Sequence, residues 1–161
     1  MTPDETALAG QALRAAEGCA RRLARSRRTL AGAFPLSAAT VNALDPGVED
    51  ALDAFLKRFE QLVNSIQDEL FKVVALVGDE DLRGLSRREV SELMDRLGVL
   101  PSAATFRALV TIRNRIAHVY PDDTDRQARN LNEAYDAVPD LLAAWESVRR
   151  YLEDRLPRST S

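Results

Sequence analysis

The side chains best able to do chemistry gather in one short segment, residues 113 to 120, which reads R-N-R-I-A-H-V-Y. At about 100° of rotation per residue in an α-helix, one arc of that helix carries Arg113, Asn114, His118 and Tyr120. The apolar residues fall on the opposite side, where they would face a core: Leu109, Ile112, Ile116 and Val119. The sequence thus predicts a guanidinium, an amide, an imidazole and a phenol on one surface.

Pro121 follows this segment directly and is expected to end the helix, because a residue before proline is pushed out of helical geometry. His118 and Tyr120 would then lie at a helix end that a substrate can reach. A plainer interpretation stays open. A lone histidine at a helix C-terminus is more often a partner of the helix dipole than a catalyst.

Cleavage of an RNA phosphodiester matches this set of groups. A base must take the 2′-hydroxyl proton, an acid must protonate the leaving 5′-oxygen, and a cation must stabilise the phosphorane. Imidazole transfers protons near neutral pH, and guanidinium binds phosphate oxygens. The chain has one histidine, so we hypothesise a two-fold dimer with two copies of His118 and Arg113 in one cleft. Asn114 would orient the substrate or His118.

Charge and composition indicate where RNA could bind and whether a metal ion or cofactor is expected. The net charge is −3, so RNA binding would depend on a local basic patch. Candidate RNA contacts are Arg115 and, on the N-terminal helix, Arg21, Arg25 and Arg28, although such a run is more often a solvated helix face. One histidine and one cysteine do not make a metal site within one chain, and no cofactor is expected.

Length and periodicity predict one domain over residues 1–161, with 157–161 as a disordered tail. The opening residues do not resemble a signal peptide, no apolar run could span a bilayer, and the lone cysteine forms no internal disulfide, so a cytoplasmic location is expected. Cys19, Phe106 and Tyr135 are interpreted as packing residues, and Trp145 as a core or dimer-contact residue.

Apolar spacing at three and four residues predicts helices throughout and no strand. The fold expected is an all-α, up-and-down helical bundle of five or six helices. A proline at position 139 is expected to kink or divide the last helix. The expected helices cover residues 4–30, 38–44, 46–77, 87–97, 103 to the edge of 121, and 124–156.

The spacing of Arg113, His118 and Tyr120 resembles the signature of HEPN domains, and in particular that of the HepT-like toxins. Asn114 supplies the polar residue that typically follows the arginine. The match at the level of residues is confined to this segment, whereas the resemblance in architecture extends over the whole chain.

That resemblance implies a homodimer with both motifs in a common cleft, acting as a metal-independent endoribonuclease with Arg113 and His118 as the active pair. It also implies the toxin of a type II-like toxin–antitoxin system, with a minimal nucleotidyltransferase as the cognate antitoxin. Such a partner can transfer AMP to the motif tyrosine, here Tyr120, and the anionic adduct would repel RNA phosphate. The alternatives are a non-catalytic HEPN substrate-binding or scaffolding partner of a nucleotidyltransferase and, third, a plain helical dimerisation protein.

Overall fold

A computed structural model describes residues 1–118 and 120–157. The predicted all-α class is confirmed, since every regular element in these residues is helical. If the continuous rod from Pro46 to Gly78 is taken as one element, the described chain has six helical segments. Val119, predicted to face the core, and residues 158–161 of the predicted tail lie outside the described residues.

Helix α1 spans Pro3–Thr29 and α7 spans Thr124–Glu153. Thr2 and Glu5 form a capping box at the start of α1, in which each side chain accepts a hydrogen bond from the other residue's backbone N–H. Pro139 lies inside α7, and the helix is not divided there. The residue is exposed, where its ring costs the helix a backbone hydrogen bond but no core packing.

The central rod consists of α3 (Pro46–Asn64), the π-helical turn η1 (Ser65–Leu70) and α4 (Phe71–Gly78). The predicted helix over 46–77 is confirmed as one continuous run. The π-turn was not predicted, because the spacing of apolar residues does not distinguish one wide turn from a regular one. Asp79 ends the rod in the left-handed conformation, with φ at 54°.

Three shorter helices complete the fold: α2 (Ala38–Asn42), α5 (Arg87–Arg96) and α6 (Ala103–Ile116). The predicted capping box of Ser86 and Glu89 is present at the start of α5. Ser102 caps α6, accepting a hydrogen bond from the backbone N–H of Thr105 at 3.2 Å. The C-terminal end of α6 differs from the prediction.

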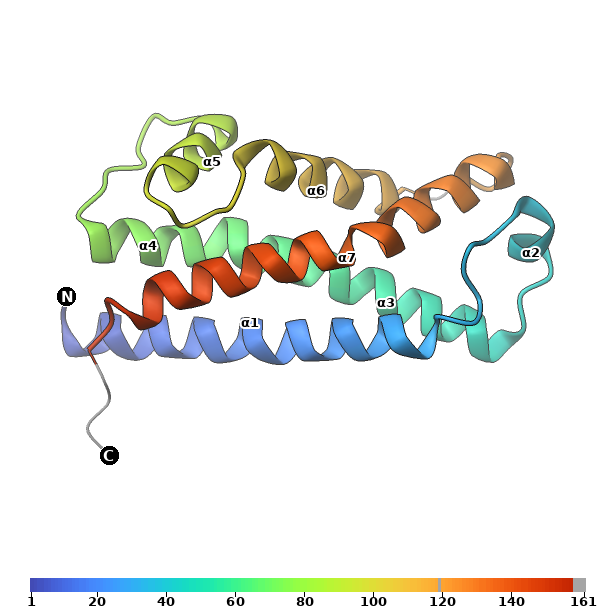
Figure 1. Ribbon diagram of the computed structural model, residues 1–161, viewed down its shortest axis with the longest axis horizontal. Coiled ribbons are helices and arrows are strands. Elements are labelled where there is room, and N and C mark those ends of the chain that lie inside the picture. The colour runs from blue at the N-terminus through green and yellow to red at the C-terminus, as the bar shows by residue number, and fades with distance from the viewer. Residues whose placement is uncertain (119, 158–161) are drawn as a thin grey trace.

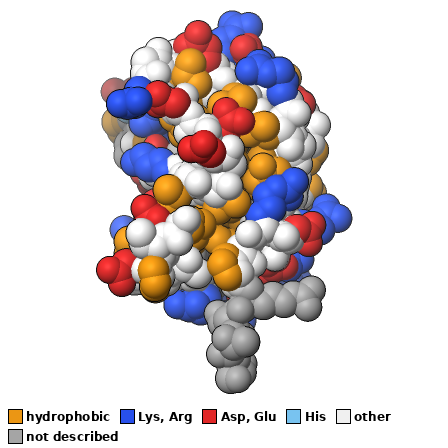
Figure 2. Space-filling view, turned by 90° about the vertical axis from the view of Figure 1, so that its left-hand side faces the viewer, with side chains coloured by type: hydrophobic (Ala, Val, Ile, Leu, Met, Phe, Trp, Pro, Cys, Tyr) orange, Lys and Arg blue, Asp and Glu red, His pale blue; other side chains and the backbone are white. Residues whose placement is uncertain are grey.

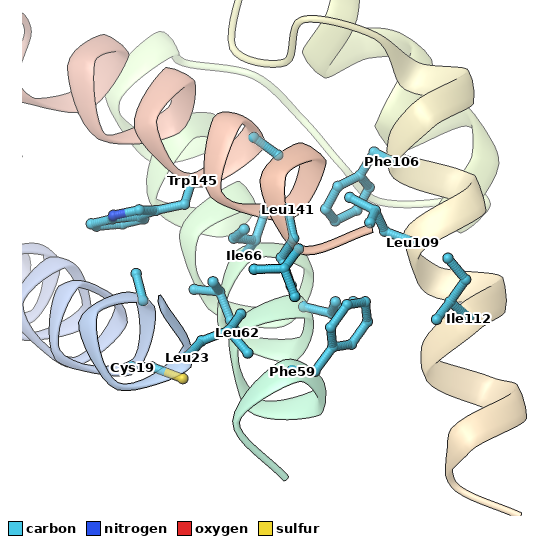
Figure 3. Packing of buried hydrophobic residues seen from close by; sticks show 14 of the residues in the cluster. Cys19, Leu23, Phe59, Leu62, Ile66, Phe106, Leu109, Ile112, Leu141 and Trp145 are labelled. Carbon is cyan, nitrogen blue, oxygen red and sulfur yellow. The ribbon is translucent and has the colours of Figure 1, made fainter. Parts of the chain in front are cut away.

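The long helices run up and down beside one another, with α1 and α6 on opposite sides of the rod and α7 (Figure 1). Buried side chains from all four meet between them, among them Leu23, Phe59, Ile66 and Leu141 (Figure 3). Each such fully buried side chain stabilises the fold by roughly 1.5–3 kcal/mol. This shared core fixes α6 against α3 and α7, and so positions the end of α6.

At the end of the bundle where α1 begins, hydrophobic side chains lie interspersed with charged ones (Figure 2). Leu8 of α1, Leu76 of α4 and Leu85 of the following loop are exposed leucines. Over residues 1–118 and 120–157, no helix combines the length and apolar character that crossing a membrane requires.

Candidate functional site

The segment that carries the predicted chemistry is divided between a helix and a loop. Helix α6 ends at Ile116, and Ala117 and His118 form a turn whose backbone N–H groups donate to the carbonyls of Arg113 and Arg115 at 3.2 and 3.3 Å. The predictions that this helix reaches the edge of Pro121, and that one helical arc carries both halves of the motif, are therefore wrong.

Pro121 sets an outer limit to this helix. A helix running up to it would aim the carbonyl of Ala117 at a proline nitrogen that has no hydrogen to donate, and the ring would clash with that carbonyl. The proline also disfavours helical geometry at Tyr120. Only two residues later, the side chain of Asp123 caps α7, accepting from the N–H of Arg126 at 3.0 Å.

Arg113 is held by three side-chain amide oxygens. Its Nε and Nη2 donate to Oδ1 of Asn114 at 3.2 and 3.0 Å. Its Nη1 donates to Oδ1 of Asn64, at the end of α3, and lies 3.4 Å from Oε1 of Gln67 in the π-turn. The guanidinium is thus fixed in the space between α6 and the central rod.

The acceptors around Arg113 are all neutral, which distinguishes it from Arg115 two residues later. Arg115 forms an ion pair with Glu133 of α7, in which its Nη1 donates to Oε2 and Oε1 at 2.9 and 3.2 Å. Within the described part of the chain, no ion pair joins Arg113 to a carboxylate. Arg113 is therefore oriented while keeping a net positive charge, and Arg115 is largely neutralised by its partner.

His118 and Tyr120 lie beyond α6 in the connection to α7. Their ring centroids are 6.5 Å apart in an edge-to-face arrangement. The guanidinium of Arg126 lies 4.0 Å from the centroid of the Tyr120 ring, a cation–π contact. His118 is exposed and Tyr120 is half-buried, so the imidazole is open to solvent while the tyrosine ring is partly held.

The structure therefore forms two pairs from the four predicted residues, Arg113 with Asn114 and His118 with Tyr120. Among the contacts of the described residues, no hydrogen bond joins one pair to the other. In this chain Asn114 orients Arg113, a role that the sequence had not indicated.

The other candidate RNA contacts lie elsewhere on the molecule. Arg21, Arg25 and Arg28 are exposed on α1, across the bundle from α6 (Figure 1). Arg27 has a structural role instead, donating to the backbone oxygen of Tyr135 at 3.0 Å and lying over its ring.

Sequence reasoning missed the residues of other helices that surround the motif: Asn64, Gln67, Arg126 and Glu133. Asn64 and Gln67 are polar residues of an amphipathic helix, and by spacing alone they belong to its solvated face. Their role depends on α6 packing against the rod, which local sequence does not specify.

The residues interpreted as packing do pack. Phe106 and Trp145 are buried, and the ring of Tyr135 stacks on Phe34 with centroids 4.1 Å apart. Burial raises the pKa of the Cys19 thiol, and the nearby charges of Arg22 and Arg58 offset this only in part. Among the described residues, no three His, Cys, Asp or Glu side chains are grouped to hold a metal ion.

Comparisons of the chain with protein-family models, with curated proteins and with solved structures found no match.

Proposed function

We propose that this chain is a HEPN-type endoribonuclease toxin that cleaves RNA without a metal ion, through Arg113 and His118. The observation that carries the proposal is the environment of Arg113. Its guanidinium is fixed by three neutral amide oxygens, so it can present its charge to a phosphate without first breaking an ion pair. Arg115, by contrast, is paired with the carboxylate of Glu133.

A homodimer would complete the site. One His118 would take the 2′-hydroxyl proton as the 2′-oxygen bonds to phosphorus, and the partner's His118 would give a proton to the leaving 5′-oxygen. The products would be a 2′,3′-cyclic phosphate and a 5′-hydroxyl, with Arg113 stabilising the charge on the phosphorane. His118 is exposed, so it is open to a second copy.

The outer face of α6 is a suitable surface for such a dimer. Its exposed residues include three small ones spaced at four and three positions, Ala104, Ala108 and Thr111. Small side chains let two helices approach closely. A two-fold axis near the end of α6 would then place the two His118-bearing turns side by side.

Tyr120 would be the site of control. We propose that a minimal nucleotidyltransferase antitoxin transfers AMP to its phenol oxygen, in the cytoplasm where both proteins would act. Tyr120 lies beside His118 and under the guanidinium of Arg126. An adenylate there would add bulk and negative charge next to His118, which would repel the phosphates of RNA.

The experiment is RNA cleavage and growth inhibition by the parent protein and by His118→Ala. The substitution removes an exposed side chain, so folding should be unchanged by circular dichroism while cleavage and toxicity are lost. Equal toxicity of the variant would refute the assignment of His118. If purified, unmodified parent protein cleaves no cellular RNA, a binding or scaffolding role is the better reading.

A further inference from the structure

Four exposed arginines lie on one side of α1: Arg21, Arg22, Arg25 and Arg28. We call them the arginine stripe. At about 100° per residue, Arg21, Arg25 and Arg28 fall within an arc of about 60°, and Arg22 lies about 60° beyond that arc. They span about 10 Å of helix at 1.5 Å per residue. In a chain whose net charge is −3, this concentration of positive charge is local.

The stripe surrounds a hollow in the surface of about 490 Å³, whose other lining residues are Gly18 and Ala24. Arg25 also lines a second, smaller hollow of about 130 Å³ together with Arg58 of α3, whose Nη1 donates to the hydroxyl of Ser26 there. The two hollows therefore share Arg25, and the positive surface continues from α1 onto α3.

Among the residues that the structure describes, no carboxylate lines either hollow. In the described part of the chain, the ion pairs within 4.0 Å involve other arginines and none of the stripe. Six arginines elsewhere in the described chain do have a carboxylate partner: Arg83, Arg87, Arg88, Arg107, Arg115 and Arg149. The stripe is thus left with uncompensated charge.

The chemistry of the lining selects the kind of partner. Protein interfaces depend on aromatic or aliphatic anchors, and binding to a lipid surface depends on an apolar helix face, whereas these hollows offer only arginine beside Gly, Ala, Ser and Thr. Guanidinium groups bind phosphate oxygens through paired hydrogen bonds. Without aromatic side chains for base stacking, recognition would be of the backbone and independent of sequence.

We propose that the arginine stripe, with Arg58, is a second RNA-binding surface that holds the sugar–phosphate backbone away from the cleavage motif. Because α1 and α6 lie on opposite sides of the bundle, the stripe does not contact the same phosphate as Arg113 of the same chain. Its role would be to retain a long RNA while a distant phosphodiester reaches the motif. That the stripe binds a polyanion follows from its uncompensated arginines. That this polyanion is RNA rests on the proposed function.

The test is the affinity of the full chain for a fluorescent 2′-O-methyl RNA 20-mer, which cannot be cleaved through its 2′-oxygen, over a series of salt concentrations. The stripe variant carries Arg21→Gln, Arg25→Gln and Arg28→Gln. A control variant with the same change in charge carries Arg96→Gln, Arg129→Gln and Arg150→Gln, which alter exposed arginines of α5 and α7.

Loss of three phosphate contacts should weaken binding by at least about tenfold and flatten the slope of log affinity against log salt by about 2, since each contact to a single strand contributes about 0.7. The control should lose clearly less. Equal losses in the two variants would overturn the proposal. The proposal would also be overturned if the stripe variant bound RNA as tightly as the parent. The same holds if the variant bound RNA normally and lost binding only to poly-glutamate or to anionic phosphatidylserine vesicles.

His118→Ala separates this proposal from the proposed function. If His118→Ala still cleaves RNA while the stripe variant loses binding, the catalytic assignment fails and the binding surface stands. If His118→Ala no longer cleaves RNA while the stripe variant binds RNA like the parent, the proposed binding surface fails and the catalytic assignment stands.

Discussion

The guanidinium of Arg113 on α6 donates a hydrogen bond to the side-chain oxygen of Asn64, the last residue of α3. Asn64 immediately precedes the π-turn, and Gln67 within that turn also faces Arg113. Wide turns of this kind often occur at functional sites. The contact joins the motif to the central rod, so the position of Arg113 depends on how α6 and α3 pack.

Asn64→Asp should lower RNA cleavage by about tenfold or more while leaving the fold intact. The new carboxylate would pair with Arg113 and neutralise the positive charge that binds the phosphate. A hydrogen bond to a charged group contributes about 1.5–3 kcal/mol. The measurement is the single-turnover cleavage rate, with thermal unfolding to follow stability.

Gln11→Glu is the matched control, because Gln11 is exposed on α1, across the bundle from α6. It makes the same chemical change and should cleave RNA at the parent rate. If Asn64→Asp also cleaves at that rate, the neutral environment of Arg113 has no role in activity.

Glu133→Gln should strengthen RNA binding modestly and change stability little. The bond between Arg115 and Glu133 is exposed, with side chains about half accessible at 47% and 46%, and such pairs contribute about 0–1 kcal/mol. Removing the carboxylate frees Arg115 to contact phosphate. Binding of 2′-O-methyl RNA should tighten by up to about fivefold at low salt, and the gain should shrink as salt screens it. Weaker binding would show that Arg115 serves structure alone.

The helices themselves were largely predictable, because each carries its own local signals. These signals depend only on residues close together in the sequence: the apolar spacing, the capping box of Ser86 and Glu89, and the Asp45–Pro46 start. The structure has helices at all of these places. The end of α6 was not predicted, although Pro121 was recognised as a terminator. The proline disfavours helical geometry only at its direct neighbour, Tyr120, so it sets an outer limit and does not predict the end at Ile116.

The composition of the candidate site was predictable only in part. Arg113, Asn114, His118 and Tyr120 were found because their types and spacing match a reaction. The contacts that orient them were not, since Asn64 and Gln67 meet Arg113 across 49 and 46 residues of sequence. Long-range contacts of this kind come from packing in three dimensions, which the period of one helix does not encode.

Asn132→Asp should destabilise the protein by about 1–3 kcal/mol. The amide of Asn132 on α7 accepts from the backbone N–H of Leu36 at 2.7 Å and donates to its carbonyl at 2.9 Å. A carboxylate keeps the first bond but replaces the second with repulsion between two acceptors. Urea unfolding should show a lower midpoint, whereas Asn130→Asp on the same helix should unfold like the parent. Equal midpoints for the two variants would show that this bidentate contact contributes nothing to stability.

Tyr120→Phe should keep RNA cleavage and lose control by the antitoxin. The ring would still lie under Arg126, since the cation–π contact at 4.0 Å involves the ring face and not the hydroxyl. The phenol oxygen that would accept AMP is absent. Intact-mass measurement after co-expression with a candidate nucleotidyltransferase should show added AMP on the parent and none on the variant, and the variant should remain toxic.

Tyr151→Phe is the control, because Tyr151 also lies under an arginine, Arg155, at 3.7 Å but near the far end of α7. It should be modified and silenced like the parent. AMP added to Tyr120→Phe at the parent level would place the modification on another residue.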